Sequence, residues 1–196
     1  AQRSRALRRA SRHLPRKLDL TVDPDARLDI QIKMGQLYED EVKDDDKAIE
    51  TYKEVLSQSG DSVVALGALD RVYERNERWE ELSEILVRKI ALLDPVDDAV
   101  QYADAKYRYG QLRHVRLQDV GGAIEAYREA LEAQPEHEGA KMALEARLED
   151  DDHRLAAGKI LEPIYEEAGA WEDLIRVHEI EIETSDDQFR QAPASS

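Results

Sequence analysis

Five histidines are the side chains in this sequence best suited to hold a metal ion or to move a proton: His13, His114, His137, His153 and His178. No two of them are four residues apart, the spacing that places two imidazoles on one face of a helix. The chain also has no cysteine, which excludes thiolate ligands, disulfides and cysteine nucleophiles. We therefore expect structural or surface histidines, and neither a metal nor another cofactor.

Other groups with chemical potential give weaker patterns. Gly121-Gly122 lacks the spacing of a phosphate-binding loop, and the serines lack the Gly-x-Ser-x-Gly setting of a hydrolase. The acidic triplets 44–46 and 150–152 lack the alternating oxygen ligands and the distal glutamate of a calcium loop. Acids that precede a helix stabilise its first turn instead. The sequence predicts helix caps at both triplets and a protein that is not an enzyme.

Composition indicates a helical protein with a strongly charged surface. Of the 196 residues, 41% are hydrophobic and 37% are charged, while only 9 are glycine and 6 are proline. Few helix breakers beside many Ala, Leu, Glu and Arg residues favour helices over sheets with many tight turns. No run of about 18 apolar residues occurs, so no transmembrane segment is expected. We expect a cytoplasmic protein, with the periplasm as an alternative if an export signal was removed.

Charge is divided unevenly along the chain. Residues 1–17 hold seven of the 28 basic residues and no acid, which leaves 21 basic against 44 acidic residues beyond them. An acidic body repels phosphate backbones, so binding of nucleic acid is not expected. The basic stretch predicts a separate N-terminal helix or arm over residues 1–15.

Internal repeats dominate the rest of the sequence. At an offset of 75 residues, Met34–Tyr38 matches Tyr109–Arg113, and Lys47–Leu56 matches Gly122–Leu131. Matches at this distance are typical of solenoids built from supersecondary units.

A second unit recurs at an offset of 92 residues. Leu69–Glu74 matches Leu161–Glu166, and Trp79–Leu82 matches Trp171–Leu174. The two offsets differ by 17 residues, which predicts an inserted helix within 138–152. Two alternating units, each near the ~34 residues of a helical hairpin, account for the pattern. The tryptophans that open the second match are expected to pack between hairpins rather than to stack on a ligand.

These units resemble tetratricopeptide repeats, in which small and aromatic residues recur at set places in both helices of a hairpin. The first and third units carry both kinds, in Met34-Gly35, Tyr38, Ala48, Tyr52 and Val55, and in Tyr109-Gly110, Ala123, Tyr127, Ala130 and Pro135. The second unit lacks the small residues and reads Leu69-Asp70, Tyr73, Leu82, Leu86 and Pro95. The spacing between the helix-interior small residues, Gly35 to Ala48 and Gly110 to Ala123, is one residue longer than the usual pattern.

The resemblance implies an all-α fold, an α-α superhelix in the form of a right-handed α-solenoid. Four to five hairpins would cover residues 16–185, and residues 186–196 would form a C-terminal tail. Such irregular arrays are typical of long bacterial repeat proteins. The expected helices cover 25–42, 46–58, 62–76, 79–93, 97–117, 120–133, 137–149, 153–168 and 170–184, with 2–13 as a further basic helix.

Packing physics favours the same arrangement. Gly35 and Gly110 cost stability inside a helix unless a neighbour presses against them. Tyr52 and Tyr127 stand where they would fill that space. Since one hairpin cannot bury its apolar stripe alone, stacked hairpins should form the core.

The resemblance also implies a binding surface, because the first helix of each hairpin lines the concave side of such a solenoid. The expected groove residues are Asp29, Ile32, Gln36 and Glu39 in the first unit, Val64, Gly67, Arg71 and Glu74 in the second, and Asp104, Tyr107, Gln111 and His114 in the third. The chaperone-tail clamp of this family needs lysines and asparagines there, whereas this chain has one asparagine, Asn76, at a turn. Acidity favours instead a protein or peptide partner with basic residues.

The sequence thus predicts a non-catalytic protein-protein interaction module or scaffold that binds a partner segment on its concave face. Two alternatives stay open. The repeat pattern runs to both ends of the chain, so exposed terminal faces could stack with another copy. The chain could also be a regulatory segment of a larger enzyme whose chemistry lies outside these residues.

Overall fold

The structure, a computed structural model, describes residues 13–191 and the side chains of residues 13–185. Every regular element in that range is a helix, which confirms the predicted all-α fold. The chain divides into two compact units, Ala1–Leu92 and Leu93–Ser196. The basic helix expected over 2–13 falls almost wholly outside the described residues. In the part that the structure describes, no helix is both long and apolar enough to cross a membrane.

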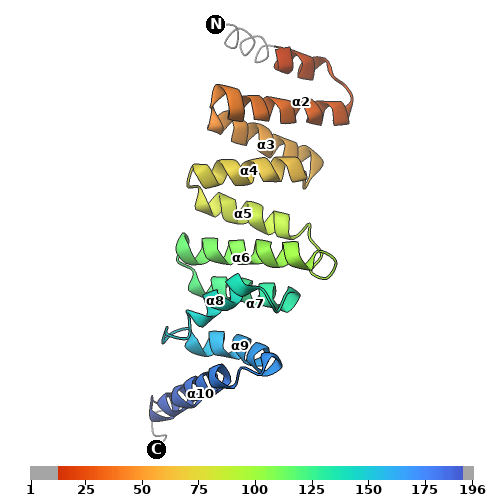
Figure 1. The fold of residues 1–196 in the computed structure, drawn as a ribbon. Helices are drawn as coiled ribbons and strands as arrows, with labels where there is room; N and C mark the ends of the chain where they lie inside the picture. The colour runs from red at the N-terminus through yellow and green to blue at the C-terminus, as the bar shows by residue number, and fades with distance from the viewer. Residues whose placement is uncertain (1–12, 192–196) are drawn as a thin grey trace, which may run out of the picture. The chain divides into compact units, whose positions relative to one another are not determined.

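In the first unit, a short helix over 13–20 precedes two helical hairpins (Figure 1). The first hairpin pairs α2 (Pro24–Gln36), continued by the π-helical turn η1 (Leu37–Val42), with α3 (Asp45–Ser59). The second pairs α4 (Val63–Arg75) with α5 (Trp79–Ile90). Helix starts follow the expected chemistry, since α2, α3 and α4 each begin after an Asp or Ser side chain that accepts a backbone N–H.

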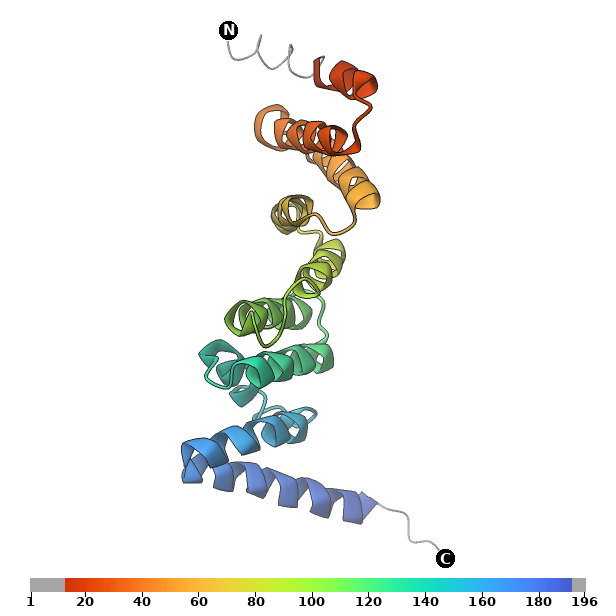
Figure 2. The same ribbon diagram turned by 90° about the vertical axis from the view of Figure 1, so that its right-hand side faces the viewer.

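In the second unit, two hairpins flank a short helix (Figure 2). α6 (Ala99–Val115) pairs with α7 (Val120–Ala133), and α9 (Arg154–Ala168) pairs with α10 (Trp171–Gln191). Between them, α8 (Glu138–Glu145) and the turns after it occupy the insertion predicted within 138–152. α10 continues beyond position 184, through residues that we expected to lie in the C-terminal tail.

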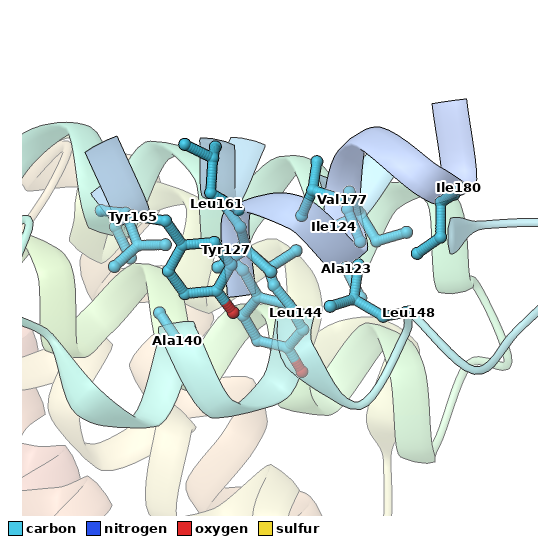
Figure 3. Close-up of a cluster of buried hydrophobic side chains, with 14 of the residues drawn as sticks. Ala123, Ile124, Tyr127, Ala140, Leu144, Leu148, Leu161, Tyr165, Val177 and Ile180 are labelled. Carbon is cyan, nitrogen blue, oxygen red and sulfur yellow. The ribbon is translucent and has the colours of Figure 1, made fainter. Parts of the chain in front are cut away.

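Small residues let the helices of the second unit approach closely. Its core joins residues of α6 to α10, and Figure 3 shows part of it, with Tyr127 and Tyr165 among aliphatic side chains. Ala140 and Ala157 are fully buried in this cluster. At Gly158 an added Cβ atom would lie 3.2 Å from Cγ1 of Val177. The backbone of α9 therefore packs closely against this side chain of α10. The predicted role of small residues at helix contacts is thus seen in these hairpins.

The extra residue between the two helices of a unit lies in a left-handed turn. Lys43 and Gln118 stand 75 residues apart and have φ angles of 60° and 55°. In each turn the next residue is an aspartate whose backbone N–H reaches back six positions, Asp44 to the Tyr38 carbonyl (3.0 Å) and Asp119 to the Arg113 carbonyl (2.9 Å). The same turn in both repeats accommodates the additional residue noted in the sequence.

Candidate protein-interaction surface

In the first unit, the expected groove residues lie on α2 and α4, the first helices of its hairpins. Asp29 and Gln36 are exposed on α2, where Ile32 is half-buried. On α4, Glu74 is exposed and Val64 is 52% exposed. The opposite faces of both helices are buried in the unit, so one face of each remains open to solvent.

Glu39 and Arg71, by contrast, make contacts inside this unit. The buried Glu39 carboxylate accepts a hydrogen bond from the Tyr52 hydroxyl (3.2 Å). It also accepts bonds from Arg71 (3.4 Å) and Arg75 (3.3 Å) of α4. Arg71 donates in addition to the Gly67 carbonyl (3.0 Å). These bonds join η1 to α3 and α4, and a partner would meet only the outer side of Arg71.

The contacts of Glu39 also affect the ionisation of Tyr52, whose buried ring lies beside it. Burial of the hydroxyl raises the pKa of Tyr52 well above its ordinary value, and the nearby Glu39 carboxylate raises it further. At neutral pH the hydroxyl is therefore a stable donor to Glu39. Arg75 extends the network by pairing with Asp45 at the start of α3, which lowers the pKa of that carboxyl.

On α6, the expected groove residues contact the segment around α8. The rings of Tyr107 and His137 have centroids 5.1 Å apart. Tyr107 also covers Gly139, where an added Cβ atom would lie 2.8 Å from its Cζ. Asp104 lies 3.1 Å from Nε2 of His137, and Gln111 donates to the Tyr107 hydroxyl at 2.7 Å. The inserted segment therefore covers part of this face, although Asp104 and Gln111 stay exposed.

His114 completes this set and repeats a contact of the first unit. Its Nε2 lies 3.3 Å from Nη1 of Arg147, which follows α8. His114 stands 75 residues after Glu39, and Arg147 stands 76 after Arg71. In both units, the end of the first helix of a hairpin thus contacts an arginine from the segment that follows that hairpin. These arginines are Arg71 of α4 and Arg147 after α8.

α8 is the positional counterpart of α4, a relationship that our sequence analysis missed. Ala65 and Leu69 of α4 are fully buried, and so are Ala140 and Leu144 of α8, 75 residues later. His137 caps α8 through Nδ1, which accepts the backbone N–H of Ala140 at 3.0 Å. Matching these small and apolar positions at the known offset of 75 could have revealed the correspondence. α9 is a second counterpart of α4, at the offset of 92.

The two tryptophans differ in their surroundings. Trp79 is half-buried at the start of α5, whereas Trp171 is 66% exposed at the start of α10. The expected packing role is therefore wrong for Trp171. Among the described residues no helix covers that side of α10, where Ile175 is exposed as well.

The acidic triplets stabilise local structure, although only the first acts as a helix cap. Asp44 accepts the backbone N–H of Lys47 (3.1 Å) at the start of α3. Asp150 accepts the backbone N–H of Asp152 (3.1 Å) and contacts His153, which shapes the turn before α9.

One group within the described side chains could hold a metal ion. The ligand atoms of Glu162, His178 and Glu181 lie within 4.8 Å of one another. Glu162 belongs to α9, and the other two stand three residues apart on α10. Histidine spacing alone could not reveal this group, because its third member comes from another helix. The 3.0 Å contact between Glu162 and His178 is also that of an ordinary ion pair, and no second observation points to an ion.

Two adjoining hollows lie between α7 and α9. The larger, of about 470 Å³, is lined by Ala133, Gln134, Pro135, Glu136, Ile164, Glu167 and Ala168. The other, of about 340 Å³, is lined by Arg128, Leu131, Glu132, Pro135, Lys159, Ile160, Pro163, Ile164 and Glu167. We call them together the α7/α9 groove. A smaller hollow of about 250 Å³ lies between α3 and α5 in the first unit.

Repeated helical hairpins of this kind define the class of α-helical repeat proteins, and comparison with known proteins supports that class. Residues 65–100 and 103–137 each match a family model described as a tetratricopeptide repeat. These two segments are therefore tetratricopeptide repeats, the family that the sequence resembled. The first match lies over the unit that lacks the small residues, and the second lies over α6 and α7.

Two solved structures are similar to this chain. A crystal structure of MamA is 22% identical, covers 89% of this chain and 88% of its own, and has a TM-score of 0.44. A second crystal structure of MamA protein is 21% identical, covers 86% and 79%, and has a TM-score of 0.41. No curated protein matched the chain.

Proposed function

We propose that this protein binds a segment of a partner protein along the exposed face of α2 and α4. Tetratricopeptide repeats are in general protein-interaction modules, which favours binding of a partner as the function. The observation that carries the proposal is the burial pattern of these helices. One face packs into the first unit, while Asp29, Gln36 and Val64 remain exposed on the other.

The chemistry of this face favours a partner segment with basic and apolar residues. Asp29 and Glu74 give it negative charge, and Val64 with its neighbour Val63, 73% exposed, gives it an apolar patch. Complementary charge raises association rates and selects partners, while apolar anchors supply affinity. In the second unit, the exposed side chains of Asp104 and Gln111 offer similar chemistry on α6.

A displayed library of peptides with basic residues, selected on the immobilised full chain, would test the proposal. Asp29→Lys and Val64→Glu are each expected to weaken binding of a selected peptide by about tenfold. Glu50→Lys is the matched control, because Glu50 is exposed on α3, outside this face. Equal effects at positions 29 and 50 would indicate bulk charge attraction, and no effect at 29 or 64 would refute the assigned face.

Arg71→Ala, on α4, is also expected to weaken partner binding. Arg71 makes intrachain contacts, so thermal unfolding of this variant has to be measured beside its affinity. Weaker binding with an unchanged melting temperature would support a direct role of Arg71 in recognition.

A further inference from the structure

The α7/α9 groove offers an apolar floor that the proposed function does not use. Leu131 is buried beneath it, and Ile160, Ile164 and Pro135 line its sides. The segment that carries α8 is inserted between these two helices, and the hollows here are larger than the one between α3 and α5. The groove has room for one or two large apolar side chains.

The edges of the groove carry hydrogen-bond acceptors. Pro163 lies inside α9 and has no N–H, so the carbonyl of Lys159 loses its helical donor. Glu136 and Glu167 form no ion pair or hydrogen bond through their carboxylates with any side chain that the structure describes. Of the two basic residues that line the groove, Arg128 is already held by two glutamates of its own helix, and Lys159 is exposed. The larger hollow has acids and no base.

One segment of the sequence has the complementary chemistry. Residues 1–12 contain five arginines, no acid and a single large apolar residue, Leu7. A guanidinium carries five N–H donors and pairs with carboxylates and carbonyl oxygens. Arg5 stands two residues before Leu7 in the sequence, and Arg8 follows it directly.

We propose that residues 1–12 of a second copy of this chain dock in the α7/α9 groove. Leu7 contacts the apolar floor, and the neighbouring arginines bind Glu136, Glu167 and the Lys159 carbonyl. This contact is separate from the exposed face of α2 and α4, so its failure would leave the proposed partner site untouched.

A labelled peptide of residues 1–15, titrated with the full chain, tests the contact directly. We expect saturable binding that weakens about tenfold when Glu167→Lys is introduced, since a carboxylate contact is replaced by repulsion. Glu166→Lys is the matched control, because Glu166 is exposed on the same helix but does not line the groove. Near physiological salt, where screening acts over about 8 Å, the control should bind within about twofold of the original chain. A peptide with Leu7→Asp should not bind.

Sedimentation velocity of the full chain tests whether the contact joins two copies. The average mass should rise with concentration, and it should stay at the monomer value for Leu7→Asp and for Glu167→Lys. Equal losses for Glu166→Lys and Glu167→Lys would overturn the site. If the Leu7→Asp chain still associates, or if the original chain stays monomeric at every concentration, residues 1–12 of a second copy do not occupy the groove.

Discussion

The ring of Tyr52 lies directly against Gly35. A Cβ atom at position 35 would be 2.5 Å from Cε1 and 2.7 Å from Cζ of this tyrosine. Tyr127 takes the same position over Gly110, with Cε1 at 2.5 Å. Both tyrosines are buried, so in each hairpin an aromatic ring of the second helix fills the space left by a glycine in the first.

This contact predicts that Gly35→Ala and Gly110→Ala destabilise the protein. Alanine favours the helix by up to about 1 kcal/mol, but forcing a methyl group against a buried ring costs about 1–3 kcal/mol. We expect a net loss of about 1–2 kcal/mol in the free energy of unfolding by urea. Gly121→Ala is the control, because nothing lies within 4 Å of a Cβ there. A gain of stability in all three variants would contradict the close contact.

Substitution of Gln31 is expected to raise the stability of the protein rather than lower it. This side chain is 1% exposed, and neither amide atom has a hydrogen-bond partner among the described residues. A buried polar group without a partner costs about 1–3 kcal/mol, so Gln31→Leu should raise the free energy of unfolding by about 1–2 kcal/mol. Gln36→Leu, at an exposed position of the same helix, should change it by less than about 0.5 kcal/mol. Loss of stability in Gln31→Leu would show that the amide is engaged.

Much of the fold was predictable because its signals are local. The helices followed from caps, breaks and apolar spacing, and the tyrosines opposite Gly35 and Gly110 followed from the repeat. The surface was less predictable, because it depends on contacts between distant segments. Tyr107 was expected in an open groove, yet it packs on His137, thirty residues later. Glu39 is buried because arginines of the next hairpin reach it, which helix periodicity in its own segment cannot reveal.

Acid should weaken the second unit through Asp119, which caps α7. Its carboxylate accepts the backbone N–H of Gly122 (2.9 Å) and pairs with Arg113. The Gly122 N–H, and then the Arg113 guanidinium, hold the pKa of Asp119 below its ordinary value of 3.8. A carboxyl whose pKa is lower in the fold than in the unfolded chain adds stability above about pH 4. That contribution is lost as the pH falls through the folded value.

Asp119→Asn separates this charge effect from the cap. Asparagine still caps a helix but does not titrate, so its unfolding free energy should fall less steeply than that of the original chain between about pH 5 and pH 2. Urea unfolding across this range measures both slopes. Parallel slopes for the original chain and Asp119→Asn would contradict the assignment.

The left-handed turns predict a stabilising substitution that follows from backbone conformation and not from any side-chain contact. Lys43 and Gln118 have φ angles of 60° and 55°, a region that costs a residue with a side chain roughly 1–2 kcal/mol. Glycine adopts it freely, although it loses more entropy on folding. Lys43→Gly and Gln118→Gly should therefore each raise the free energy of unfolding by about 0.5–1 kcal/mol. Gln134→Gly, where φ is −142°, should instead lower it, because only the entropic cost applies. Similar losses at all three positions would show that the repeated turn is not strained.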